Sequence, residues 1–152
     1  MGTGGSFPHY PLALRVQALD ISLPMLARAQ RRAQEDGAKA DLLWMDAQAL
    51  AFPEASFDAV ISSLVFCSVP DPIQGLQEVR RVLKPGGQFI LMEHVRSQTP
   101  LGWAMDLLNP LAVRLGGDNI NRDTLGNLRQ AGFRIEAVER LFWDIFLLIE
   151  AK

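Results

Sequence analysis

The stretch that decides the fold runs Leu83-Lys84-Pro85-Gly86-Gly87-Gln88-Phe89-Ile90-Leu91-Met92-Glu93-His94. Its first part ends a helix, because proline and glycine disfavour helical backbone. Its second part, residues 88–94, is apolar at its centre and predicts a strand. The preceding helix opens at Asp71-Pro72 and repeats apolar residues on one face: Ile73, Leu76, Val79 and Leu83. A helix that turns directly into a strand is typical of α/β proteins.

The same alternation continues toward the N-terminus. Strands are predicted at residues 15–20, 41–45 and 57–63. A helix should join the first two, because Ser22 can cap its start, Pro24 suits its first turn and Gly37 suits its end.

The C-terminal part adds two helices and two strands. Residues 100–115 predict an apolar helix with a kink before Pro110. Asp123 or Asn121 should cap a short helix that ends at Gly132. Strands are then expected at residues 133–140 and 144–151.

The order of these elements predicts an α/β fold with an open, mostly parallel sheet. The last two strands have no helix between them, so they should pair antiparallel at a sheet edge. We interpret residues 1–152 as a single domain. In such a sheet a ligand lies outside the carboxyl ends of the strands.

Composition narrows the function classes. Apolar residues make up 49% of the chain and charged residues 21%, which indicates a globular domain. The net charge of −2 disfavours binding to the backbone of a nucleic acid, which needs a basic surface. Cys67 is the single cysteine, which excludes an internal disulfide, and with only His9 and His94 we expect no metal site. We interpret Cys67 as a buried small residue.

The sequence predicts a cytoplasmic protein without an integral membrane segment. Residues 1–6 are glycine-rich and uncharged, unlike a signal segment. Residues 141–149 are apolar but are broken by Asp144 and fall short of the roughly 20 residues that span a bilayer. Gly2 and Ser6 also fit a loose myristoylation pattern, which a glycine turn explains as well.

Residues at three places suggest a nucleoside pocket. Gly2-Thr3-Gly4-Gly5 can approach a ligand closely, or it forms a flexible tail. Asp20 ends the first predicted strand, where a carboxylate can accept bonds from ribose hydroxyls or simply cap the next helix. Asp46 follows the second strand, where it can accept the amine of an adenine or belong to a turn.

The chain resembles the class I S-adenosylmethionine-dependent methyltransferases, which have a Rossmann-like fold. The resemblance is to the small-molecule branch, with quinone C-methyltransferases and phospholipid or thiol methyltransferases. The motifs that carry it are Phe57-Asp58-Ala59-Val60-Ile61-Ser62-Ser63, Pro70-Asp71-Pro72, Glu78-Val79, Arg81-Val82-Leu83-Lys84-Pro85-Gly86-Gly87 and Glu93-His94-Val95-Arg96-Ser97. Residues 116–124 also resemble the phospholipid and thiol relatives.

The resemblance implies S-adenosylmethionine as cofactor and a small-molecule acceptor as partner. Glycines 2 and 4 with Thr3 would line the methionine end, and Asp20 would hold the ribose. The residues implied at the adenine are Ile21, Met25, Asp46 and Ala47, although Met25 also suits a core position. Ser63 and Leu64 would pass under the sulfonium, although a serine there can simply end a strand.

One departure from the family pattern concerns the first motif. The chain starts inside it, at Met1-Gly2-Thr3-Gly4, so the family's first strand is missing and the domain is expected to be N-terminally incomplete. That strand normally lies between those of Asp20 and Ser62. Its neighbours could pair directly, another copy could donate a strand in a homo-oligomer, or the native protein is longer.

Methyl transfer from a sulfonium is an in-line displacement, so the protein chiefly has to align the reactants. A base is needed where the acceptor carries a proton. His94 is the best-placed candidate, unless it only satisfies a local hydrogen bond, and Glu93 and Asp106 are weaker ones.

The acceptor is expected to be apolar or amphiphilic. Residues that could cover it are Trp103, Met105, Leu107, Leu108 and Leu111, which a core helix explains equally well. Two further functions compete with methyl transfer. A non-catalytic subunit of the same fold would act through association, whereas nicotinamide-dependent oxidoreduction lacks a Tyr-x-x-x-Lys set, since the one tyrosine is Tyr10.

Overall fold

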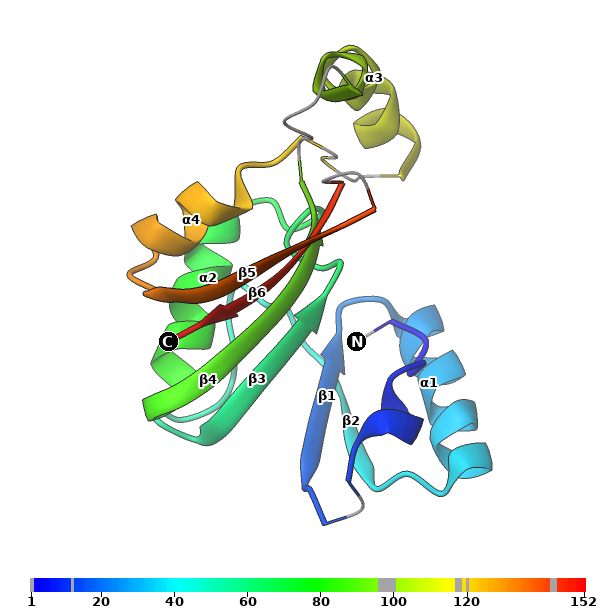
Figure 1. Ribbon diagram of the computed structural model, residues 1–152. Coiled ribbons are helices and arrows are strands. Elements are labelled where there is room, and N and C mark those ends of the chain that lie inside the picture. The colour runs from blue at the N-terminus through cyan, green and yellow to red at the C-terminus, as the bar shows by residue number, and fades with distance from the viewer. Residues whose placement is uncertain (1, 12, 96–100, 117–118, 120, 143–144) are drawn as a thin grey trace. The chain divides into compact units, whose positions relative to one another are not determined.

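The computed structural model describes residues 2–11, 13–95, 101–116, 119, 121–142 and 145–152 (Figure 1). The chain forms two compact units, Met1–Ala51 and Phe52–Lys152. None of the helices in the described part combines the length and apolar character needed to cross a membrane. The predicted helix start at Pro100 and strand start at Asp144 lie outside the described residues, as do Arg96, Ser97 and Gly117 of the family motifs.

The first unit is a two-stranded parallel sheet with one long helix. Its elements are the 3-10 helix η1 (Phe7–His9), β1 (Val16–Asp20), α1 (Leu23–Asp36) and β2 (Ala40–Trp44). β1 and β2 pair in register from Val16 opposite Ala40 to Asp20 opposite Trp44. Its small core consists of Phe7, Ala18 and Ala29, which are buried together.

α1 begins and ends at the residues that the sequence predicts, but its N-terminus lacks the side-chain capping hydrogen bond that was expected. Ser22 is the N-cap residue, but its side chain makes no capping hydrogen bond. Pro24 removes one of the two usual donors for such a cap, because it is the second residue of the helix and has no N–H to donate to the Ser22 hydroxyl. Gly37 ends the helix in the left-handed conformation at φ 64°, and its N–H donates to the Ala33 carbonyl.

The second unit is a four-stranded sheet in the order β3-β4-β6-β5. Its elements are β3 (Phe57–Ser63), α2 (Pro72–Val82), β4 (Leu83–His94), α3 (Leu101–Gly116), α4 (Thr124–Gln130), β5 (Ile135–Leu141) and β6 (Phe146–Ala151). β3 and β4 are parallel, and β6 runs antiparallel to both β4 and β5. The antiparallel pair at the C-terminus is therefore confirmed.

The glycine-rich turn lies inside β4, which begins directly where α2 ends. Leu83 already pairs with Phe57, and the regular register resumes at Gln88 opposite Ala59. A Cβ at Gly87 would lie 2.9 Å from the Lys84 carbonyl oxygen. Only glycine fits where the backbone approaches this closely, so the turn acts as an irregularity within the strand.

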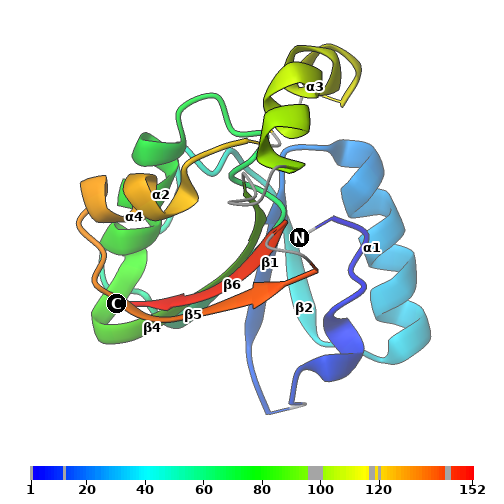
Figure 2. The same cartoon turned by 45° about the horizontal axis from the view of Figure 1, so that its top comes forward.

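One face of the four-stranded sheet is covered by α2 and α4, which Figure 2 shows side by side. The largest fully buried side chains of this unit are Phe89, Leu76, Leu91, Leu128, Leu147 and Ile149. The Phe89 ring packs against Phe133 and Phe66, with ring centroids 5.2 and 6.3 Å apart. Burial of these apolar side chains provides the main stabilisation of the unit.

The strands form two hydrogen-bonded sheets rather than one. β1 pairs only with β2, and β3 pairs only with β4, in the part of the chain that the structure describes. One of the three outcomes expected for the missing strand was direct pairing of the Asp20 strand, β1, with the Ser62 strand, β3. The described residues do not form this pair.

Candidate cofactor site

Asp20 ends β1 with its carboxylate held by backbone groups. The N–H of Gly2 donates to one carboxylate oxygen at 2.8 Å, and the N–H of Ser22 donates to the other at 2.9 Å. The bond from Ser22 places the Asp20 carboxylate beside the start of α1. It therefore also supports, in part, the alternative that Asp20 caps this helix. A carboxylate has about four acceptor positions, so this arrangement fixes its orientation and is compatible with further donors.

Asp46 lies at the same end of the two-stranded sheet as Asp20. The N–H of Met45 donates to the Asp20 carbonyl at 3.2 Å, which extends the pairing of β1 and β2 to the residue directly before Asp46. Asp46 itself forms a local turn, because its carboxylate accepts the N–H of Gln48 at 2.8 Å. The carboxyl ends of the two strands therefore carry the two acids together.

The apolar residues predicted at the adenine lie around this end. Ile21 and Met25 are exposed, while Ala47 is half-buried. The exposure of Met25 argues against a core role. Trp44, on β2, is exposed as well, and its indole N–H donates to the Ile21 carbonyl at 2.9 Å.

The glycines of the N-terminal loop differ in their surroundings. Gly2 and Gly4 both have positive φ, at 62° and 76°, and Thr3 between them is half-buried. A Cβ at Gly4 would lie 2.5 Å from the Phe7 ring, so packing already explains why Gly4 has no side chain. A Cβ at Gly2 would have nothing within 4 Å. Gly2 is thus the more open of the two positions.

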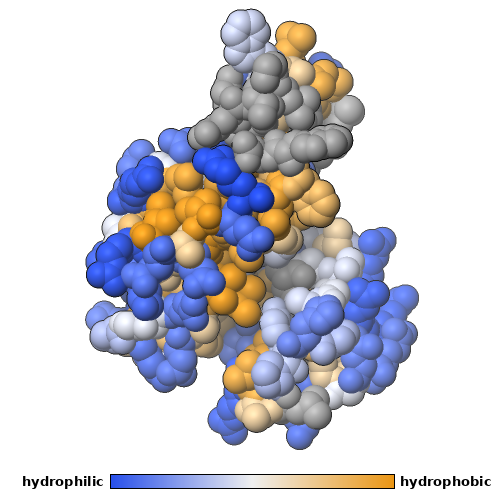
Figure 3. Space-filling model, in the orientation of Figure 1, coloured by the Kyte–Doolittle hydropathy of each residue, from blue (hydrophilic) through white to orange (hydrophobic). Residues whose placement is uncertain are grey.

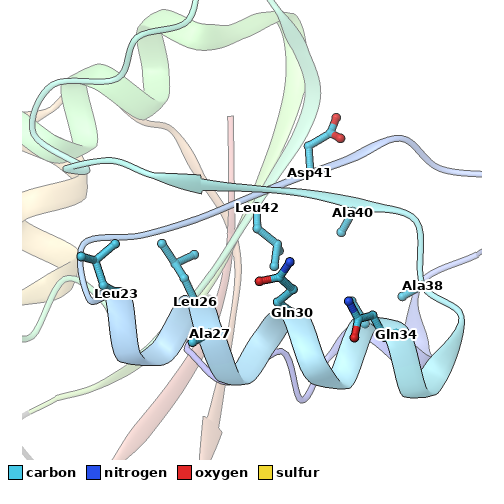
Figure 4. Close-up of a pocket in the computed structure, with 10 residues that line it drawn as sticks. Leu23, Leu26, Ala27, Gln30, Gln34, Ala38, Ala40, Asp41 and Leu42 are labelled. Atoms are coloured by element: carbon cyan, nitrogen blue, oxygen red, sulfur yellow. The ribbon is translucent and has the colours of Figure 1, made fainter.

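The first unit also contains a cavity of about 580 Å³ between α1 and β2 (Figure 4). Leu26, Gln30 and Leu42 are among its lining side chains, and Figure 4 shows them in the space between helix and strand. The predicted cofactor residues of the described part do not line it. We therefore regard this cavity as separate from the candidate site.

In the second unit, Ser63 ends β3 and Leu64 turns the chain away from the sheet. Leu64 adopts the left-handed conformation at φ 54°, which is unfavourable for a residue with a side chain. Its N–H donates to the Met92 carbonyl of β4 at 2.9 Å. The neighbouring Ser62 hydroxyl is buried and has no hydrogen-bond partner among the described residues.

Glu93 on β4 holds the loop that follows Leu64. One of its carboxylate oxygens accepts the N–H groups of Val65 and Phe66 at 2.7 and 2.8 Å, and the other accepts that of Cys67 at 3.2 Å. The Glu93 side chain is fully buried, and burial raises its pKa, while the three N–H bonds act in the opposite direction. Because the side chain is buried and both of its oxygens already accept backbone N–H groups, the Glu93 carboxylate organises the loop and is poorly placed to take a proton from an acceptor.

His94 follows on the same strand and is half-buried. Its ring stacks on Phe146 of β6, with ring centroids 4.1 Å apart. Asp106, the other weaker base candidate, is exposed and accepts a bond from the Asn121 amide at 3.1 Å. Cys67 is buried, as expected.

No group of three His, Cys, Asp or Glu side chains in the described part lies close enough to hold a metal ion.

The predicted site residues divide between the two units. Those in the first unit are Gly2, Thr3, Gly4, Asp20, Ile21, Met25, Asp46 and Ala47, and those in the second are Ser63, Leu64 and His94.

Comparison with known families identifies the domain. Residues 1–91 match the family described as methyltransferase domain. The chain belongs to this methyltransferase domain family. Together with the relatives below, this match identifies a class I S-adenosylmethionine-dependent methyltransferase domain of the small-molecule branch.

Two relatives of the methyltransferase domain illustrate the branch. Phosphatidylethanolamine N-methyltransferase of Cereibacter sphaeroides is 36% identical over 104 residues, which cover 66% of this chain and 51% of that protein. Thiol S-methyltransferase TMT1B of Homo sapiens is 35% identical over 149 residues, which cover 91% of this chain and 59% of that protein. The methyltransferase domain thus spans about half the length of these relatives.

Solved structures agree on the fold. An S-adenosylmethionine-dependent methyltransferase from Mesorhizobium loti has a TM-score of 0.70 and 24% sequence identity, over 90% of this chain and 79% of that one. This likeness confirms the Rossmann-like α/β architecture. Of its described strand pairs, two are parallel and two are antiparallel, so the sheet is mixed where the sequence predicted a mostly parallel one.

The residues of the methyltransferase domain fit the cofactor that its family and fold imply. Ribose hydroxyls and the adenine amine are hydrogen-bond donors, and the carboxyl ends of β1 and β2 present two acceptors, Asp20 and Asp46. The unpartnered Ser62 hydroxyl is a further polar group beside Ser63. Sequence reasoning missed Glu93 as a loop-holding residue, although an acid at the end of an apolar strand was a visible signal.

Proposed function

We propose that this domain transfers a methyl group from S-adenosylmethionine to a small apolar or amphiphilic acceptor by in-line displacement. The observation that carries the proposal is the geometry of Asp20. Its carboxylate stands at the carboxyl end of β1, oriented by the N–H groups of Gly2 and Ser22. In Rossmann-like sheets, an acid at such a position accepts hydrogen bonds from ribose hydroxyls.

The remaining roles are those that the family resemblance implies. Asp46 would accept the adenine amine, with Ile21, Met25 and Ala47 as its apolar surroundings, while Gly2, Thr3 and Gly4 line the methionine end. Ser63 and Leu64 would pass under the sulfonium, in a loop that Glu93 holds rigid. S-adenosylmethionine supplies an activated methyl group when bound, so these residues chiefly align the reactants.

The acceptor class is inferred from the relatives. Those described above are named for a phospholipid and for thiols, and a third, from Thermus thermophilus, is named demethylmenaquinone methyltransferase. Such acceptors are apolar or amphiphilic. Thiols and quinols carry a proton that must leave, and His94 would accept it as a base.

Titration calorimetry with S-adenosylhomocysteine tests the nucleoside pocket. We expect micromolar binding by the wild type and at least a tenfold loss in Asp20→Ala. Asp41→Ala is the matched control, because Asp41 is an exposed acid on β2 that accepts a bond from Gln17. Equal losses in the two variants would contradict the assigned role of Asp20.

The alternative function is a non-catalytic subunit that acts through association. One observation favours it: among the described residues, β1 and β3 each have one edge without a strand partner, and such edges readily pair with another chain. A folded wild type that does not bind S-adenosylhomocysteine and sediments as a homo-oligomer would support this alternative. Binding by a monomer would count against it.

A further inference from the structure

The loop after β3 is held on two sides. Its N–H side donates to the buried Glu93 carboxylate, and its carbonyl side accepts bonds from a distant segment. The Cys67 carbonyl accepts the backbone N–H of Asn119 at 3.0 Å and the side-chain amide of the same residue at 3.3 Å. The Val69 carbonyl accepts a guanidinium N–H of Arg122 at 2.8 Å. Residues 52 and 53 positions further along the chain therefore fix the loop together with Glu93.

Asn119 and residues 121–123, which we call the strap, also bond to two helices. The Asn121 amide donates to Asp106 of α3 at 3.1 Å. The Asp123 carboxylate caps the start of α4. The strap thus joins the loop after β3 to α3, the helix that the sequence places over an acceptor.

The apolar residues of α3 are mostly exposed, which contradicts the core-helix explanation. Met105 is buried, whereas the exposed fractions of the others range from 52% to 81%. These exposed residues are Trp103, Leu107, Leu108 and Leu111. Figure 3 shows apolar side chains at the top of the view, where α3 lies. Because this face has no core to pack against, polar bonds such as that from the strap to Asp106 contribute to holding α3.

Arg122 provides the charged donor of the strap. It is half-buried, and among the described residues its side chain forms no ion pair and donates to the Val69 carbonyl alone. Val69 is buried, and no second donor to its carbonyl lies in the described part of the chain. A buried carbonyl that loses its donor is unfavourable, and a charged donor binds it more strongly than a neutral one. Removal of the guanidinium should therefore release this end of the loop.

The loop lies where a shift would affect the chemistry. It begins directly after Leu64, at the carboxyl end of β3, and an open α/β sheet binds its ligand outside such ends. β4 runs parallel to β3, so His94 lies at the same end of the four-stranded sheet. In-line methyl transfer depends on alignment, and a displacement of about 1 Å can lower the rate on the order of 100-fold.

We propose that Arg122 is a positioning residue for methyl transfer. It acts through the Val69 carbonyl and holds the loop after β3 in the place where the acceptor meets the methyl group. This role rests on the proposed function. Loss of Arg122 should lower kcat with little change in cofactor affinity, because Asp20 and Asp46, which hold the nucleoside in that proposal, belong to the first unit.

Methyl transfer to butanethiol tests the role in the full chain. Arg122→Met keeps the apolar stem and removes every N–H donor, so kcat should fall about tenfold or more, while the dissociation constant for S-adenosylhomocysteine stays within about twofold of the wild-type value. Because Arg122 makes a single bond, Arg122→Lys keeps a sufficient cationic donor and should restore kcat to within about threefold of the wild type. Arg129→Met is the matched control, because Arg129 is exposed in the last turn of α4 and its guanidinium has no partner among the described residues.

Hydrogen exchange measures the state of the loop without the reaction. The amides of residues 65–67 should exchange faster in Arg122→Met than in Arg129→Met, while those of β1 should exchange at the same rate in both. Circular dichroism melting confirms that each variant is folded at the assay temperature.

Four results would overturn the positioning role. They are an Arg122→Met kcat equal to that of the wild type, an equal loss in Arg129→Met, an Arg122→Lys variant no more active than Arg122→Met, and a loss of S-adenosylhomocysteine affinity as large as the loss of kcat. A wild type that transfers no methyl group would overturn the proposed function together with this role, whereas the exchange data alone decide whether Arg122 holds the loop.

Discussion

The carboxylate of Glu93 accepts the backbone N–H of Phe66 at 2.8 Å, although 27 positions separate the two residues in the chain. This bond, with those from Val65 and Cys67, ties the loop after β3 to the end of β4. All three N–H groups donate to the same buried carboxylate. Glu93 therefore anchors the start of the loop, and the bond from the Asn119 amide to the Cys67 carbonyl adds further support.

Glu93→Gln should lower the free energy of unfolding by about 1–3 kcal/mol at pH 7, because one backbone N–H of the loop then faces an amide group instead of an acceptor. Urea unfolding measures the change. Glu139→Gln is the control, since Glu139 is exposed on β5, and we expect it to change stability by less than about 0.5 kcal/mol. Equal effects in both variants would contradict the role of Glu93.

The pH dependence of stability should also differ between these variants. Burial raises the pKa of Glu93 in the folded chain, so the folded state holds this proton more tightly than the unfolded state. Its contribution is full below about pH 4.3, where an unfolded glutamate ionises, and is lost as the pH rises through the raised folded pKa. Unfolding measured from pH 4 to pH 8 should show this decrease in Glu139→Gln and not in Glu93→Gln.

Local signals predicted most of the elements. β3 has the predicted bounds, and α1 ends at Gly37, because apolar periodicity and turn residues act over a few neighbouring positions. Asp20 and Asp46 were placed together for the same reason, since both follow strands that pair in parallel.

Features that depend on distant residues were not predictable in this way. The bonds from residues 65–67 to Glu93 join separate parts of the chain, and nothing in the loop's own sequence specifies them. The exposure of α3 has a different cause. Apolar spacing is the same for a helix that faces a core and one that faces a partner, so periodicity could not choose between them.

Asp123→Ala should lower the free energy of unfolding by about 1 kcal/mol, because the Asp123 side chain caps α4 by accepting the N–H of Gly126 at 2.9 Å. The control is Asn121→Ala, the other cap that the sequence allowed. Asn121 instead donates to exposed Asp106, and this bond should contribute less than about 0.5 kcal/mol. Thermal unfolding followed by circular dichroism compares the two. A larger loss in Asn121→Ala would show that the cap is assigned to the wrong residue.

Leu64→Gly should be more stable than Leu64→Ala by about 0.5–1 kcal/mol. Leu64 has φ 54°, where glycine avoids the clash that any Cβ meets, and this gain exceeds glycine's greater entropy loss on folding. Ile61 on β3 is the control position, where Gly should be less stable than Ala because the backbone is extended. The same order at both positions would contradict the strain at Leu64.

His94→Phe should separate a chemical role of His94 from a packing role. The His94 ring stacks on Phe146, and phenylalanine can keep this stacking while it removes the nitrogen that would accept a proton. We expect unchanged affinity for S-adenosylhomocysteine. Methyl transfer to an aliphatic thiol should fall about 100-fold, as is usual when a general base is lost. Phe146→Leu is the partner control, since it weakens the stacking and leaves the imidazole in place. If His94→Phe retains the wild-type rate while Phe146→Leu loses stability, His94 serves packing alone, and the proton leaves the acceptor without this residue.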